Sequence, residues 1–210
     1  MYINNPEGHP LILASSSPRR RRLLEQLGIE FEVVSAEIDE VPRPGRNPAS
    51  EAIRIAEEKA LAVTRLRPKR RWFLAADTMV IINGDILGKP RDEEEAAWML
   101  GRLAGKRHTV ITGWCLLHGA LAVKRSDHVE SRVLIRPLSS AHIRAYVRSG
   151  EPMDKAGAYA AQGIGAFMIQ SIEGSYTNVV GLPLTEVVDA LEEVGAIRLS
   201  AIPPADLKLP

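Results

Sequence analysis

The chain has 210 residues, a formal net charge of +1, and hydrophobic and charged contents of 45% and 25%, values typical of a globular protein. The balanced charge and the aromatic content of only 5% argue against a nucleic-acid binder, and no apolar run is long enough to cross a bilayer. Cys115 is the single cysteine, which excludes an internal disulfide, and the N-terminal residues MYINNPEGHP lack the features of a signal peptide. We therefore expect a soluble, cytoplasmic α/β protein without nucleic-acid or membrane partners.

The first half of the chain alternates strand and helix patterns. Ser17 and Asn47 are good N-caps, and each precedes a proline at the first helical position. The Asn-Gly pair at 83–84 predicts a type I′ hairpin, and Asp92 with Glu95 resembles a capping box. The expected elements are a strand over 11–14, a helix over 18–27, a strand over 31–35, a loop over 41–48, a helix over 48–65, a strand over 72–76, a hairpin over 80–87 and a helix through 103.

The second half is first rich in strand patterns and then punctuated by glycines. We expect turns at 118–119 and 126–127 within the β-rich stretch, and Ser139 or Ser140 begins a helix that ends near Gly150. The remaining expected elements are strands within 108–135, a strand near 167–172 and a last helix over 184–194.

Strands and helices intermix along the whole chain without a clear linker. This pattern predicts an α/β fold with a mixed sheet and flanking helices. We expect an N-terminal arm over 1–10, a single domain over 11–198 and a proline-rich tail over 199–210.

An arginine run follows the first predicted strand, at the start of the first helix. Arg21 and Arg22 can pair with Glu25 one turn later, whereas Arg19 and Arg20 have only leucines at the matching positions. The helix dipole opposes each cation in a first turn by roughly 0.3–1 kcal/mol. Serine hydroxyls, free backbone N–H groups and two uncompensated guanidinium groups therefore favour a phosphate site over the alternative, a solvated helix face.

Asp77 follows the buried strand directly, where α/β folds place catalytic and metal-binding aspartates. A turn-forming or capping aspartate is nevertheless the commoner outcome at such a position. Glu40, Lys89, Asp154 and Lys155 lie in loop-like segments and are ordinary surface charges when each is taken alone. Together these side chains offer carboxylates for a hard divalent cation and cations for phosphate, which phosphoryl transfer requires.

Other chemistries lack their motifs in this sequence. It contains no Walker loop, no zinc-binding histidine spacing and no G-x-S-x-G nucleophile elbow. The glycines at 163 and 165 lack the third glycine of a dinucleotide-binding fingerprint, and Cys115 lies in an apolar strand typical of a core. Phosphate chemistry with a carboxylate-held metal is therefore favoured over zinc hydrolysis, nucleophilic serine or cysteine catalysis, and redox chemistry.

Six motifs, in order, resemble the Maf family over about residues 11–193. They are LILASSSPRR, AADT at 75–78, GKP at 88–90, HTVITG at 108–113, GEPMDKAGAYAAQG at 150–163 and GSYTNVVGLPL at 174–184. The resemblance implies a Maf/ITPase-like fold with two lobes around a central cleft, and often a homodimer. It also implies a nucleoside triphosphate pyrophosphatase that uses Mg²⁺ or Mn²⁺ to convert a nucleoside triphosphate and water to the monophosphate and pyrophosphate.

The resemblance also implies a role for individual residues. Asp77 would be the proton acceptor and, with Glu40, a metal ligand. Three positions, Arg19, Thr78 and Gln162, would set the substrate, and their identities look like the dTTP/UTP branch. The positions that would bind phosphate are Ser15, Arg19, Arg20, Lys59 and Lys89, and we add Lys155 as a further candidate for the phosphate chain.

Three questions stay open at this point. Asp77 could act mainly as the base or mainly as a metal ligand, because either role needs an ionised carboxylate at this position. Glu57 and Glu58 precede Lys59, so Lys59 could equally be a surface residue of its helix. The function could instead be a house-cleaning pyrophosphatase of broad or 7-methyl-GTP specificity, or a non-catalytic nucleotide-binding regulator of cell division.

Overall fold

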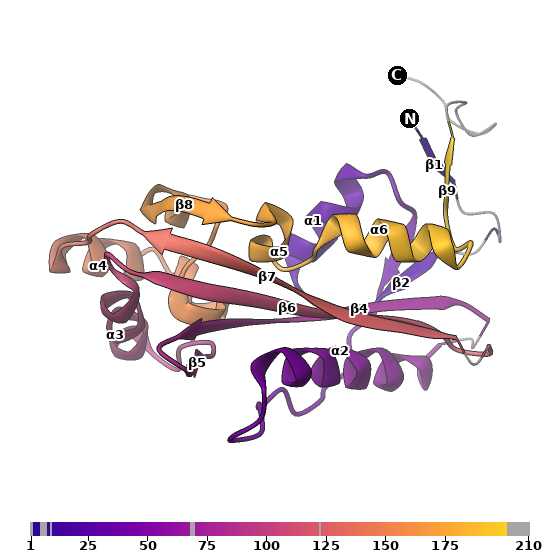
Figure 1. The fold of residues 1–210 in the computed structure, drawn as a ribbon, viewed down its shortest axis with the longest axis horizontal. Coiled ribbons are helices and arrows are strands. Elements are labelled where there is room, and N and C mark those ends of the chain that lie inside the picture. The colour runs from indigo at the N-terminus through magenta and orange to yellow at the C-terminus, as the bar shows by residue number, and fades with distance from the viewer. Residues whose placement is uncertain (1, 5–7, 9, 68–69, 122, 201–210) are drawn as a thin grey trace.

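The computed structural model describes residues 2–4, 8, 10–67, 70–121 and 123–200 of the chain. Its central feature is a mixed seven-stranded sheet (Figure 1). The strands of this sheet are β2 (Leu11–Leu13), β3 (Phe31–Val33), β4 (Trp72–Ile82), β5 (Asp85–Leu87), β6 (Arg107–His118), β7 (Lys124–Ile135) and β8 (Ile169–Glu173). The spatial order is β3-β2-β4-β6-β7-β8, with β5 also paired to β4. The β2–β3 and β2–β4 pairs are parallel and the other pairs are antiparallel.

Helices flank this sheet, as the sequence predicts. The α-helices are α1 (Pro18–Gln26), α2 (Pro48–Thr64), α3 (Glu93–Leu103), α4 (Ser140–Val147), α5 (Tyr176–Val180) and α6 (Leu184–Glu193). Three short 3₁₀ helices are η1 (Glu151–Asp154), η2 (Ala156–Ala158) and η3 (Ile164–Met168). In the described part of the chain, no helix combines the length and the apolar character needed to cross a bilayer.

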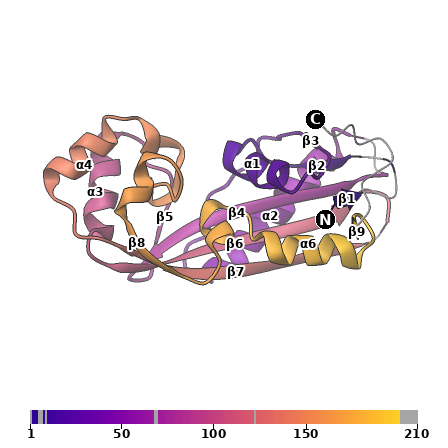
Figure 2. The same ribbon diagram turned by 90° about the horizontal axis from the view of Figure 1, so that it is seen from above.

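The long strands β4, β6 and β7 join two lobes (Figure 2). In one lobe α2 covers one face of the sheet, and α1 and α6 cover the other (Figure 1). Both faces of β4 are therefore buried there, with Leu74 and Ala76 in one core and Phe73 and Ala75 in the other. The second lobe has its own core, built from α3, α4 and the far ends of the strands. The predicted α/β class with two lobes is confirmed.

Several local capping and turn signals in the sequence are confirmed in the structure. The Asn47 side chain accepts hydrogen bonds from the backbone N–H groups of the first turn of α2, and Asp92 accepts one from Glu95. Asn83 and Gly84 both have positive φ, 53° and 87°, which is the type I′ geometry between β4 and β5. Ser17 occupies the N-cap position of α1, but its side chain makes no capping bond.

Four sequence-based expectations need correction. The turn expected at 126–127 is wrong, because Ser126 and Asp127 are paired with β6 inside β7. Asp77 does not end its strand but lies inside β4. The expected arm and tail contain the paired strands β1 (Tyr2–Asn4) and β9 (Arg198–Ser200), while residues 5–7 and 201–210 lie outside the described part. The short helices η1, η2, η3 and α5 were not predicted.

Candidate active site

The site forms where one edge of β4 has no neighbouring strand in the described chain. β2 accompanies β4 only as far as Leu74, whose carbonyl accepts from Ala14, and β5 pairs with β4 only from Val80 onward. Between these two contacts lie Asp77 and Thr78. Because side chains alternate along a strand, Asp77 faces the α2 side of the sheet and Thr78 faces the α1 side. Groups from both faces can therefore meet at this gap.

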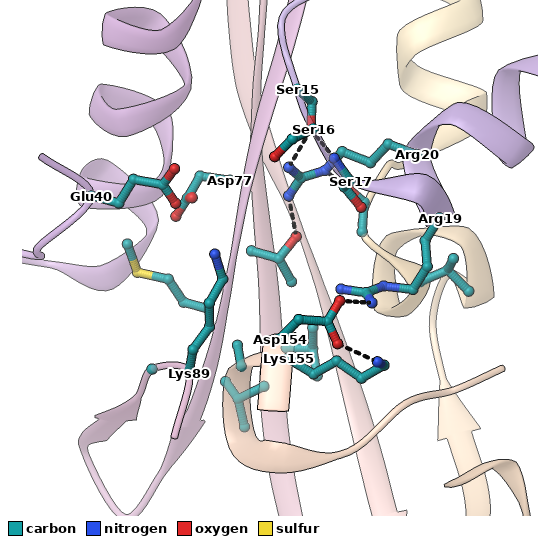
Figure 3. Close-up of a pocket in the computed structure, with 18 of the residues that line it drawn as sticks. Ser15, Ser16, Ser17, Arg19, Arg20, Glu40, Asp77, Lys89, Asp154 and Lys155 are labelled. Carbon is teal, nitrogen blue, oxygen red and sulfur yellow. Dashed lines mark hydrogen bonds and ion pairs between the residues drawn. The ribbon is translucent and has the colours of Figure 1, made fainter. Parts of the chain in front are cut away.

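A cleft of about 710 Å³ occupies the gap, a size within the usual range for small-molecule sites. Figure 3 shows the Glu40 and Asp77 carboxylates close together on one side of the cleft and the guanidinium groups of Arg19 and Arg20 on the other. Positive side chains outnumber negative ones, so the cleft favours a polyanion. The charged lining residues are Arg19, Arg20, Lys59, Lys89 and Lys155 against Glu40, Asp77 and Asp154.

A buried lysine joins the two carboxylates on the α2 side. Lys59 Nζ is 2.8 Å from Asp77 Oδ1 and 3.0 Å from Glu40 Oε2. Asp77 and Lys59 are each only 8% exposed, so Lys59 is not a surface residue of α2. Burial opposes ionisation of Glu40, but the charges of Lys59 and Lys89 outweigh it and hold the pKa of this carboxyl below its usual value. The Glu40 carboxylate is therefore available as an anion.

Arg20 is held on the α1 side by neutral oxygens. Its Nε donates to the Gly181 carbonyl at 2.7 Å, Nη1 donates to Ser15 Oγ at 3.1 Å, and Nη2 donates to Thr78 Oγ1 at 3.0 Å. The guanidinium is buried, and burial lowers its pKa from the usual value. These bonds use part of the donor capacity of a guanidinium group, so N–H groups remain to bind phosphoryl oxygens.

The other predicted cations have different surroundings. Arg19 Nη1 lies 3.3 Å from Asp154 Oδ2, so Arg19 has an acidic partner that the sequence did not reveal. Asp154 also pairs with Lys155, which in turn donates to the Glu151 carbonyl. Lys89 is exposed at the rim, after β5. Arg21 pairs with Glu25 outside the cleft, as predicted.

One predicted specificity residue lies apart from the others. Gln162 is half-buried and follows the lining segment 159–161, but it is not among the described residues that line the cleft. Its loop is held by Glu151, whose carboxylate accepts from the backbone N–H groups of Ile164 and Gly165 at 3.0 and 2.7 Å.

Supporting residues on β6 and α5 were missed by the sequence reasoning, although their motifs were noticed. His108 Nε2 is 2.7 Å from the hydroxyl of Tyr159, a cleft residue. Burial lowers the pKa of His108 to about 4, so its imidazole is neutral at physiological pH. Thr112 links Thr78 to Asn178 by hydrogen bonds. The only sequence signal for these residues was their place in HTVITG and GSYTNVVGLPL.

Comparison with known proteins identifies the family of this chain. The family model described as Maf-like protein matches residues 10–194, and the chain belongs to this family. The resemblance inferred from the six motifs is confirmed.

Two relatives are similar in sequence to this chain along nearly their whole length. The chain is 49% identical over 201 residues to the dTTP/UTP pyrophosphatase of Syntrophotalea carbinolica, covering 94% of this chain and 91% of that protein. It is 49% identical over 192 residues to the dTTP/UTP pyrophosphatase of Geobacter metallireducens, covering 91% and 100%. The fold is also similar to that of a HAM1 protein from Coxiella burnetii, with a TM-score of 0.50, 16% identity and coverage of 88% and 98%. This last likeness concerns the fold alone.

Proposed function

We propose that this protein is a nucleoside triphosphate pyrophosphatase that hydrolyses dTTP and UTP to the monophosphates and pyrophosphate. The observation that carries the proposal is the pairing, across one cleft, of the Asp77–Lys59–Glu40 cluster with the anchored Arg20 guanidinium. The 49% identity to proteins named dTTP/UTP pyrophosphatase supports the choice of substrate.

The donor set fits a divalent cation for which substrate and water would supply most of the ligands. One ammonium group contacts both Asp77 and Glu40, so oxygens of both carboxylates lie within reach of a single cation. Across the described residues, no set of three or more His, Cys, Asp or Glu could enclose a metal. Mg²⁺ is commonly bound in this way, by one or two carboxylates and substrate phosphates. Bound Mg²⁺ or Mn²⁺ would neutralise phosphate charge and acidify a coordinated water.

The chain's own residues supply the remaining steps. Asp77 accepts a proton from the water whose oxygen attacks the α-phosphorus, and the bond to the bridging oxygen breaks as pyrophosphate leaves. Arg19, Arg20 and Lys89 hold the β- and γ-phosphates and stabilise the charge on the leaving pyrophosphate. Ser15 and Lys155 contribute further donors to the phosphate chain. Lys59 orients Asp77 and Glu40.

The experiment measures pyrophosphate release from dTTP, UTP, CTP, GTP and 7-methyl-GTP with Mg²⁺ or Mn²⁺. We expect dTTP and UTP to give the highest kcat/KM. Asp77→Asn keeps a side-chain oxygen that can accept from Lys59, so we expect the fold to be retained. The variant lacks the base, and we expect its rate of pyrophosphate release to fall by about 10²–10⁴-fold. A rate near that of the wild type would contradict the base assignment.

The same measurements separate the alternatives. Highest activity on 7-methyl-GTP, or equal activity on all five nucleotides, would favour a house-cleaning enzyme. Binding of dTTP without turnover would favour a nucleotide-binding regulator. The family resemblance also favours a homodimer, which light scattering of the purified chain tests directly.

A further inference from the structure

Lys59 holds the position between the two carboxylates on the α2 side of the cleft. Its Nζ lies 2.8 Å from Asp77 Oδ1 and 3.0 Å from Glu40 Oε2, so one ammonium group contacts both. The two carboxylates lie close together in the cleft (Figure 3), although they come from β4 and from the loop between β3 and α2. A positive charge is therefore already present where both carboxylates attract a cation most strongly.

The packing of α2 keeps this ammonium group in place. Lys59 lies on the buried face of the helix, and its neighbours Ala56 and Ala60 are 0% exposed. Only 10% of the Lys59 side chain and 11% of the Asp77 side chain are exposed. If Lys59 moved out to solvent, the buried Asp77 carboxylate would lose its partner, which is strongly unfavourable. Lys59 is therefore a fixed part of the empty cleft and not a side chain that a second cation can readily displace.

The charge of this cluster is unfavourable for a divalent cation that arrives alone. Lys59 cancels one of the two negative charges of Asp77 and Glu40 and repels any cation that binds the same oxygens. Asp154 is the remaining carboxylate among the described residues that line the cleft, and it already pairs with two cations. The empty cleft therefore lacks the negative charge that a divalent cation needs.

A nucleoside triphosphate changes this balance. Its phosphate chain brings several negative charges and oxygen ligands into the cleft, and Mg²⁺ is commonly held by one or two carboxylates together with such phosphates. The added negative charge offsets the repulsion from Lys59, and the phosphate oxygens supply ligands that the protein lacks. The cluster is thus a poor site for a cation alone but a suitable site for a cation that arrives with a nucleotide.

We infer that Lys59 is a resident cation that excludes Mg²⁺ or Mn²⁺ from the empty cleft, so that the divalent cation binds only together with the nucleotide. The inference rests on the proposed function, because it takes Asp77 and Glu40 as the residues that hold this cation. Lys59 is then a positioning residue that acts through the two carboxylates. A lysine that merely supported the fold would affect stability and turnover, but not the affinity of the empty protein for a cation.

The first test measures Mn²⁺ binding without nucleotide, from the electron paramagnetic resonance signal of unbound Mn²⁺. Lys59→Met keeps most of the length of the side chain but removes its charge. We expect this variant to bind Mn²⁺ more tightly than wild type by about tenfold or more, because the repelling charge is gone. Lys124→Met is the matched control and should bind Mn²⁺ as wild type does, since Lys124 also pairs with a glutamate, Glu57, but does not line the cleft.

A double variant tests where the additional Mn²⁺ binds. Lys59→Met combined with Glu40→Gln removes one positive and one negative charge, so the gain in affinity should disappear. A gain that persists in the double variant would place the Mn²⁺ elsewhere and overturn the inference. Equal Mn²⁺ affinity of Lys59→Met and wild type would overturn it as well, as would an equal gain in Lys124→Met.

The wild-type protein provides a test that needs no variant to fold. We expect Mn²⁺ alone to leave its thermal unfolding temperature unchanged. Mn²⁺ added to the complex with α,β-methylene-UTP, which resists cleavage at the scissile bond, should raise this temperature, because a ligand of the folded state stabilises it. A rise with Mn²⁺ alone, or no rise in the nucleotide complex, would contradict the inference. Neither measurement requires turnover, whereas the proposed function fails if wild type releases no pyrophosphate from dTTP or UTP.

Discussion

Arg20 is a buried cation whose direct partners are neutral oxygens. Gly181, Ser15 and Thr78 come from three separate segments, and each takes a different nitrogen of the guanidinium group. Burial of a charge without a directly bound carboxylate is costly, which is why its pKa is lowered. In the function proposed above, a bound phosphate would supply the missing negative charge.

Arg20→Lys is the prediction at this scale. Lysine keeps the charge, but its ammonium group cannot reach three separate acceptors in fixed directions and still offer a planar pair of donors to phosphate. We expect kcat/KM for dTTP to fall roughly 10- to 100-fold, the effect of losing one or two charged hydrogen bonds.

Arg21→Lys provides the control for this substitution. Arg21 is the next residue of α1, and its partner Glu25 lies outside the cleft. Steady-state pyrophosphate assays should give it nearly wild-type kinetics. Equal losses in both variants would show that the effect concerns the helix and not the Arg20 site.

At the level of elements, α2 and β6 lie close together at Gly113. A Cβ atom at this position would lie 2.3 Å from the carbonyl carbon of Ala52 and 2.4 Å from the backbone nitrogen of Ile53. These are backbone atoms of α2, so they cannot yield as a flexible side chain would. The same helix carries Lys59, and the close approach therefore sets the distance from Lys59 to Asp77.

Gly113→Ala should consequently reduce both stability and activity. Forcing a methyl group into this contact moves α2 away from the sheet, at a cost of about 1–3 kcal/mol in the free energy of unfolding. Urea denaturation followed by circular dichroism measures this change.

Gly101→Ala is the matched control. Gly101 lies in α3 with nothing within 4 Å of an added Cβ, and alanine favours a helix over glycine by roughly 0.8–1 kcal/mol. This variant should be slightly stabilised. A Gly113→Ala protein as stable as Gly101→Ala would refute the proposed close approach.

At the scale of the whole molecule, buried polar contacts connect the long strands to the segment that follows η2. His108 of β6 contacts the Tyr159 hydroxyl, and its Nδ1 is buried without a partner in the described structure. Burial holds its pKa at about 4, below the 6.5 of a free histidine. Between pH 4 and pH 6.5, His108 therefore binds a proton in the unfolded chain but not in the folded protein.

The pH dependence of global stability follows from this difference. Because the unfolded state takes up the proton, the contribution of His108 is fully present above pH 6.5 and is lost as the pH falls toward 4. Between pH 7 and pH 5 the loss is about 2 kcal/mol. Urea unfolding at the two pH values measures it. In His108→Asn the decrease should be smaller by about that amount, and an unchanged decrease would contradict the assignment.

Local features of this fold could be predicted because neighbouring residues determine them. Asn47 and Asp92 cap their helices through their own side chains, and the Asn-Gly pair at 83–84 turns the hairpin with no help from distant residues. The sequence also distinguished Arg21, which pairs with Glu25 one helical turn later, from the arginines predicted to bind phosphate. The family resemblance then named Asp77, whose position alone had favoured an ordinary turn residue.

The sequence by itself therefore determined the α/β class, most helix starts, the hairpin and the motifs that identify the family. Only the tertiary structure decided that Asp77 lies within a long strand, one edge of which has no paired strand between β2 and β5 among the described residues. It also decided that Lys59 is buried between two carboxylates and that Arg19 pairs with Asp154. The same holds for the hydrogen bonds by which Thr112 links Thr78 to Asn178. Caps and turns depend on a few adjacent residues, whereas these contacts join segments far apart in the chain, whose distances are set by how the whole sheet and its helices pack.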